Sequence, residues 1–142
     1  MESGNSSGGG TAEKSMTKMQ ALYSFFSSFG IPAYEENAIY AADVVLPLPY
    51  ITYSVSTASF LSGDIPISAS IWYRSASWKE ISEKADAVSA RLSNGGVHIP
   101  CDDGFVWLKR SNGTFAQMTG DPSDKFVKRA ILNISAEYFT TN

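Results

Sequence analysis

The chain has 142 residues, of which 44% are apolar and 13% aromatic, and this length and composition suit one globular domain with a packed core. Its formal charge of −3 and isoelectric point near 5.0 leave no basic surplus, which argues against a protein that binds nucleic acid or an anionic membrane. The single cysteine, Cys101, excludes an intrachain disulfide framework, and neither a secretory signal pattern nor a run of about 18 apolar residues is visible. We therefore expect a protein that is made in the cytoplasm, with no specific nucleic-acid binding and no membrane partner.

Residues 1–15 are rich in glycine and serine and almost free of apolar side chains. Ordering such a segment costs conformational entropy and buries nothing in return. We predict a disordered tail at 1–15, with an added leader ahead of a natural start at Met16 as the alternative. Residues 16–142 are then expected to form a single α+β domain.

A first helix is predicted over about residues 14–29, where apolar side chains recur at helical spacing before Gly30 and Pro32. The stretch from there to about residue 49 contains three prolines and no sustained periodicity, so we expect an irregular crossing of the surface. Proline is tolerated where a strand begins, and the next strand should therefore start at about Tyr50.

Residues 50–60 and 65–73 both alternate between two kinds of side chain, which predicts an antiparallel hairpin that turns at Gly63 and Asp64. In the second strand the isoleucines should face the core, which leaves Trp72 on the outward face. Because tryptophan is enriched at binding hot spots, Trp72 is a candidate partner contact.

A second helix is predicted over about residues 78–93, where apolar residues recur at steps of three and four. Ser77 and Glu80 have the spacing of a capping box at its start. Asn94 and the two glycines that follow it should end this helix.

Four strand signals follow, at residues 97–101, 105–110, 114–118 and 126–139, the last with one apolar side. Asn112 followed by Gly113 predicts a tight hairpin, because both residue types accept a positive φ. The element order is α-β-β-α-β-β-β(-β), in which two helices can cover one face of a mainly antiparallel sheet. The sequence therefore predicts an α+β fold arranged as a two-layer sandwich.

The sequence shows no group of residues with the spacing of a catalytic site or a metal site. His98 is the only histidine, and strand alternation should point its side chain away from Cys101, which argues against a Cys-His nucleophile. Neighbouring carboxylates are explained by turns, capping and solvation, and clustered zinc ligands are missing. We expect no enzyme, no cofactor and no catalytic, cofactor-binding or metal-binding residues.

Four strings stand in order along about residues 19–140: GIPAYEENAI, LPLPYITYSV, ASIWYRSASWKEISEKADAVSARL and FVWLKRSNGTFAQMTGDPSDKFVKRAILNISAEY. Together they resemble small proteins encoded among the tail genes of tailed bacteriophages and prophages, close to the tail-terminator or tail-completion family. The resemblance implies an antiparallel sheet backed by helices and assembled as a ring of six. It also implies a structural role in the virion tail or neck, after assembly in the host cytoplasm. There the ring docks on the last layer of tail-tube protein, stops polymerisation and meets the head-tail connector protein.

A closed ring needs two different patches on each subunit. We predict contacts with other copies or partners at the hairpin tip, at the outward tryptophan and at one later loop: Phe60, Leu61, Ser62, Gly63, Asp64, Trp72, Asp121, Pro122, Ser123 and Asp124. Phe60 and Leu61 are apolar at a turn, where they would otherwise meet water. The alternative, that both loops are merely solvated, stays open.

Two other functions also stay open. The chain could be another neck or minor tail component of the same particle, with a different neighbour. It could instead be a small-molecule binding module that uses the concave face between helices and sheet, in which case polar groups should converge in an apolar pocket.

Overall fold

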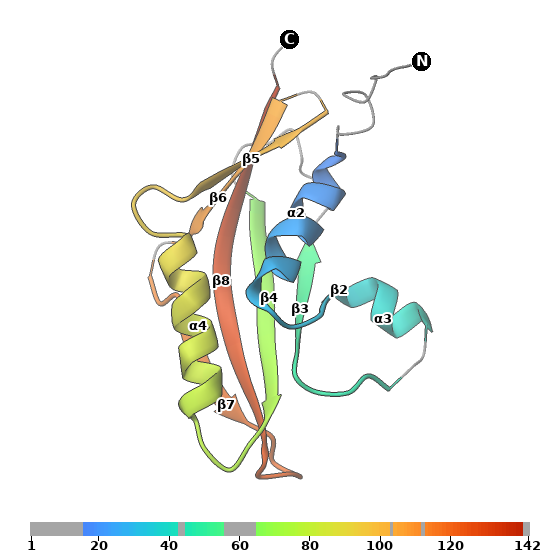
Figure 1. Cartoon of the computed structure of the whole chain (residues 1–142), viewed down its shortest axis with the longest axis vertical. Coiled ribbons are helices and arrows are strands. Elements are labelled where there is room, and N and C mark those ends of the chain that lie inside the picture. Colours follow the sequence, from blue (N-terminus) through green and yellow to red (C-terminus); the bar gives the residue numbers. More distant parts are fainter. Residues whose placement is uncertain (1–15, 43–44, 56–64, 103, 112, 141–142) are drawn as a thin grey trace, which may run out of the picture.

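The computed structural model describes residues 16–42, 45–55, 65–102, 104–111 and 113–140. The elements of this part of the chain, shown in Figure 1, are α2 (Lys18–Phe26), η1 (Ser27–Phe29), β2 (Ala33–Glu35), α3 (Glu36–Ala42), β3 (Tyr50–Val55), β4 (Ile65–Arg74), α4 (Lys79–Arg91), β5 (Val97–Cys101), β6 (Gly104–Arg110), β7 (Ala116–Gly120) and β8 (Val127–Thr140).

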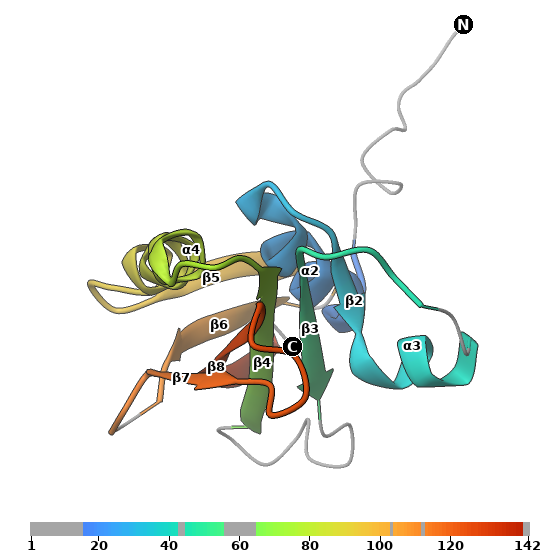
Figure 2. The same cartoon turned by 90° about the horizontal axis from the view of Figure 1, so that it is seen from below.

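The strands form one seven-stranded sheet in the order β2-β3-β4-β8-β6-β5, and β7 also pairs with β8. Because β4 occupies one side of β8, the strands β6 and β7 share its other side and follow one another along it. Seen end-on in Figure 2, the sheet curls into a half-barrel, with α2 and α4 on one face and α3 beyond the β2 edge. β2 and β7 therefore border the sheet on opposite sides.

The core lies between this curled sheet and the two longer helices. Leu22 and Phe26 of α2 are fully buried, and the Phe26 ring stacks on Tyr53 of β3 with ring centroids 4.6 Å apart. α4 contributes Ile81 and Val88, which are also fully buried. Helical spacing places these side chains on one stripe of each helix, which is why both helices lie flat on the same apolar face.

The first predicted helix is confirmed from Lys18, and a 3-10 turn carries it on to Phe29. It begins with a capping box that sequence reasoning missed. The Thr17 hydroxyl accepts a hydrogen bond from the backbone N–H of Gln20 at 3.1 Å, and the Gln20 side chain accepts one from the Thr17 N–H at 2.9 Å. Two of the N–H groups that a helix start leaves unpaired are thereby satisfied.

The second predicted helix is confirmed as α4, but the capping box expected at its start is wrong. Trp78 is the N-cap residue and makes no capping side-chain bond. The Ser77 hydroxyl accepts from the Lys79 N–H at 3.0 Å, whereas the Glu80 carboxylate accepts from the Ser75 hydroxyl at 2.6 Å. The glutamate is thus engaged with the preceding turn instead of reaching back to the cap.

The long predicted strands are confirmed where the structure describes them. β3 and β4 are antiparallel, with Tyr50 opposite Trp72 and Val55 opposite Ile67. β8 has one buried side, formed by residues that are 0% exposed: Ala130, Leu132, Ile134 and Ala136. Residues 56–60 of the predicted first strand and the predicted turn at residues 63–64 lie outside the described residues.

The stretch expected to be irregular contains β2 and α3 instead. β2 pairs with β3 in parallel, so the sheet is mixed. The two carboxylate oxygens of Glu35 accept hydrogen bonds from the N–H groups of Asn37 and Ala38, both at 3.1 Å, which stabilises the start of α3. The α+β class is confirmed. The simple two-layer sandwich in the predicted order is not, because of this inserted β-α unit and the curl of the sheet.

The hairpin predicted at residues 112 and 113 is also wrong. Arg110 at the end of β6 pairs with Ile134, and Ala116 at the start of β7 pairs with Leu132, so the chain keeps its direction along β8. Between these two pairs, Asn133 accepts from the Ser111 N–H at 3.1 Å and donates its own N–H to the Phe115 carbonyl at 2.8 Å. β6 and β7 therefore pair in succession with the same side of β8.

Candidate subunit-contact surfaces

The predicted contact residues do not gather at one place. Those of the hairpin tip lie outside the described residues: Phe60, Leu61, Ser62, Gly63 and Asp64. They precede Ile65, the first residue of β4, whereas Trp72 lies near the other end of that strand. The ten residues of β4 span roughly 30 Å at about 3.3 Å each. A contact that uses both ends would therefore extend along the whole sheet.

Trp72 faces away from α2 and α4, as alternation requires, and is half-buried. Its indole N–H donates to the Thr52 hydroxyl at 3.0 Å. The Arg129 guanidinium lies 4.6 Å from the ring centroid, and the Arg129 Nε donates to the Ser70 hydroxyl at 2.9 Å. These contacts hold the Arg129 guanidinium over the Trp72 ring.

A hollow of about 270 Å³ opens beside Trp72. It is lined by Glu36, Ile39, Tyr50, Thr52, Trp72 and Arg129. The hollow thus combines a cation, a carboxylate and apolar walls between α3 and the face of the sheet opposite α2 and α4.

The loop from Asp121 to Asp124 is held mainly by its own hydrogen bonds. The Asp121 carboxylate accepts from the Ser123 N–H at 2.7 Å and the Ser123 hydroxyl at 2.8 Å, and these bonds lower the pKa of Asp121. The hydrogen bond from the Arg74 guanidinium at 2.5 Å, followed by that from the Phe126 N–H, lowers the pKa of Asp124. Pro122 at the tip is exposed.

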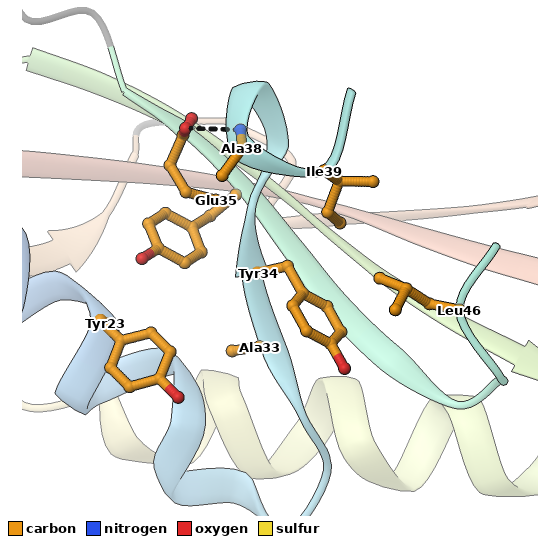
Figure 3. A pocket seen from close by; sticks show the side chains of 8 residues that line it. Tyr23, Ala33, Tyr34, Glu35, Ala38, Ile39 and Leu46 are labelled. Carbon is orange, nitrogen blue, oxygen red and sulfur yellow. Dashed lines mark hydrogen bonds between the residues drawn. The ribbon is translucent and has the colours of Figure 1, made fainter. Parts of the chain in front are cut away.

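An apolar groove of about 430 Å³, which sequence reasoning missed, runs beside the β2 edge (Figure 3). It is lined by residues of four elements and a loop: Tyr23, Ala33, Tyr34, Glu35, Ala38, Ile39, Leu46 and Tyr53. Burial, followed by the nearby charge of Glu35, raises the pKa of Tyr53 to about 12.

Five large hydrophobic side chains of the described residues are strongly exposed: Tyr23 (53%), Val45 (100%), Trp78 (41%), Met118 (39%) and Phe126 (39%). Tyr23 lines the groove, and Val45 precedes Leu46 there. We call Tyr23, Tyr34, Ile39, Val45 and Leu46 the groove patch.

The other three exposed side chains lie near the β7 edge, and we call Trp78, Met118 and Phe126 the β7 patch. The Lys128 ammonium lies 5.1 Å from the Trp78 ring centroid, and the Lys128 backbone pairs with Gly120 of β7. Phe126 lies in the loop that joins β7 to β8. Exposed apolar side chains therefore collect at two opposite edges of one sheet, and such collections mark contact surfaces.

His98 and Cys101 point to opposite faces of β5, as the alternation predicts. The exposed His98 ring stacks on Trp107 with centroids 5.5 Å apart, whereas Cys101 packs against the core on the helix side. In the part of the chain that the structure describes, no group of three or more histidine, cysteine, aspartate or glutamate residues is placed to hold a metal ion. None of the described helices is long and apolar enough to cross a membrane.

Comparison with known proteins gives a likeness of fold. No protein-family model matches the chain, and no curated protein matches it significantly. A chain in the solved structure described as "Virion of native gene transfer agent (GTA) particle" is similar in fold, with a TM-score of 0.51 and 18% identity. The likeness covers 84% of this chain and 92% of that chain.

Proposed function

We propose that the chain is a structural protein of a phage-like particle. The observation that carries this proposal is the likeness to a virion chain of a gene transfer agent, which covers 84% of one chain and 92% of the other. Because one fold can host many functions, the likeness alone does not assign a role. The tail-gene resemblance of the sequence points independently to the same kind of particle.

Within such a particle, the role is that of a tail terminator: a ring of six copies that caps the tail tube and joins it to the head. Its partners are other copies of the chain, the tail-tube protein and the head-tail connector protein, in the tail or neck of the virion. A ring needs two different patches on each subunit, and the groove patch and the β7 patch meet that requirement. The role is architectural and requires no catalytic group.

Deletion of the gene from the genome that encodes the particle tests this role. Electron microscopy of the lysate should show tails of unregulated length that are not joined to heads, because tube polymerisation lacks its stop. The wild-type gene supplied in trans should restore tails of uniform length. Tails of normal length already joined to heads in the deletion strain would show that the role is wrong.

A different neck or minor tail component is the alternative within the same particle. Light scattering over a concentration series of the purified full chain separates the two. A closed hexamer favours the terminator, whereas a monomer at every concentration favours the alternative.

A small-molecule binding module is a second candidate, supported by the hollow where Arg129 and Glu36 converge beside Trp72. A thermal-shift screen with small carboxylates and amino acids tests it. A shift in Tm that disappears in Arg129→Ala would support this module, and a screen without any shift would contradict it.

A further inference from the structure

Three strands of the described sheet lie at its edges, and they differ in how the edge is protected. β5 contains Pro100, and the Asp102 N–H just beyond it donates to the Met16 carbonyl at 2.7 Å. β2 is only three residues long and runs directly into α3. β7 has five residues, AQMTG, with neither a proline nor a charge. Natural proteins blunt exposed edges with such features, so β7 is the edge suited to pair with another chain.

The backbone of β7 offers hydrogen-bonding groups on its outer side. The Phe115 carbonyl accepts from Asn133 at 2.8 Å, and the Asp121 N–H donates to Val127 at 3.2 Å, so these odd-numbered residues face β8. Backbone groups alternate in direction along an antiparallel strand. The N–H and C=O groups of Ala116, Met118 and Gly120 therefore point away from β8.

The side chain of Met118 adds apolar surface at the same edge. Met118 lies opposite Ala130, whose side chain faces the core, so Met118 lies on the helix side of the sheet. It is 39% exposed, as is Phe126. An edge with outward backbone groups and apolar side chains can bind another chain, which would pair with the backbone and cover the apolar surface.

The opposite edge provides such a surface. The groove patch borders β2, and its volume of about 430 Å³ leaves room for a methionine side chain. The charges around the two patches also differ in sign. Lys125 flanks Phe126 of the β7 patch, with its ammonium 5.4 Å from the ring centroid, whereas Glu35 lines the groove. Residues 1–15 are a poorer match for the groove, since they have almost no apolar side chains.

We propose that the β7 patch of one copy docks on the groove patch of the next copy. In this contact Met118 enters the groove between Tyr23, Tyr34 and Leu46. Because the two patches lie on opposite edges of the sheet, the contact is head-to-tail and repeats from copy to copy until the ring closes. The inference rests on the proposed ring and names the surfaces that form it.

Disulfide trapping tests the pairing of the two patches. In a Cys101→Ser background, one chain carries Met118→Cys and a second carries Leu46→Cys; the two are mixed and oxidised. We expect covalent dimers that contain one chain of each kind, and a chain that carries both substitutions should give a ladder of cross-linked species up to the closed ring. Gln117→Cys is the matched control, because its side chain points to the other face of β7 and should trap little.

Two trapping results would contradict the pairing. Preferential Met118→Cys homodimers would show a two-fold contact between β7 strands. Equal trapping by Gln117→Cys would show that the cross-links arise from random collision.

Proline substitution provides a second test that does not depend on cross-linking. Met118→Pro removes an N–H that points away from β8, so the monomer should keep its Tm while the hexamer seen by light scattering is lost. Gln117→Pro is the control, since it removes a bond to β8 and should lower the Tm of the monomer.

The light-scattering results distinguish a failure of the β7 contact from a failure of the proposed ring. Rings that persist in Met118→Pro would overturn the β7 contact and leave the ring intact as a proposal. A wild-type chain that stays monomeric at every concentration would overturn both.

Discussion

The two faces of β4 differ in what covers them. Facing α2 and α4, the side chains of Ile65, Ile67, Ala69 and Ile71 are at most 1% exposed. On the opposite face Pro66 and Ser68 are exposed. A shift of one residue in pairing would exchange these two sets, so burial of the isoleucines fixes the register of the central strands. The face opposite α2 and α4 has no such apolar row, and its exposed part is available for polar contacts and partners.

Alanine substitutions on the two faces of β4 should differ most in their effect on the free energy of unfolding. Ile67→Ala removes a side chain that is 1% exposed and should lower the free energy of unfolding by about 2–5 kcal/mol. Ser68→Ala, one residue away on the exposed face, should change it by less than about 0.5 kcal/mol. Urea unfolding followed by circular dichroism measures both. Equal effects would mean that the core does not lie on the isoleucine side.

The turn from the helix layer to the sheet offers a sharper contrast between two adjacent glycines. Gly95 and Gly96 have φ of +91° and +89°, so alanine at either position should cost about 1–2 kcal/mol. A Cβ on Gly96 would also lie 2.2 Å from the backbone oxygen of Leu108, whereas one on Gly95 would meet nothing within 4 Å. Gly96→Ala should therefore be the more destabilising of the two by a further amount of about 1–3 kcal/mol. Thermal unfolding of the pair checks this, and similar Tm values would contradict the close approach.

The contrast between the faces also explains how far the sequence predicts this fold. β4 and β8 are long enough for their alternation to show which side is buried, and α4 shows a clear helical stripe. β2 and α3 have only three and seven residues, which is too short for either period to appear. Asn112 and Gly113 have the local chemistry of a hairpin, but pairing with β8 overrides it, and such long-range pairing is not visible in a dipeptide.

The groove patch escaped prediction because its residues come from separate segments that meet only in the fold. Tyr23 lies on α2, Tyr34 on β2 and Leu46 in the loop before β3. The one available signal was Val45-Leu46, an apolar pair placed beside prolines in a stretch without periodicity. Met118, by contrast, ends the strand predicted at residues 114–118, whereas the structure places it in the middle of β7 (Ala116–Gly120) at an edge of the sheet.

Burial on the core face should also appear in the pH dependence of stability. The pKa of Tyr53 is raised from 10.0 to about 12, chiefly by burial. The neutral phenol is favoured in the folded state, so its contribution is complete below pH 10 and is lost as the pH rises from 10 to 12. Tyr53→Phe should reduce this alkaline loss by about 2 kcal/mol, at about 1.4 kcal/mol per pKa unit. Urea titrations at pH 9 and pH 11.5 measure the difference.

The smallest effect is expected outside both faces, at the loop that joins β7 to β8. The Arg74 guanidinium holds the pKa of Asp124 below its usual value, whereas bonds from Ser123 do so for Asp121. Arg74→Ala should therefore raise the pKa of Asp124 and leave that of Asp121 low, a pattern that carboxyl NMR titration resolves residue by residue. The Tm should hardly change, because exposed ion pairs contribute little to stability. If the two carboxyl pKa values rise together, the loop depends on Arg74 as a whole, and its internal hydrogen bonds do not by themselves hold its shape.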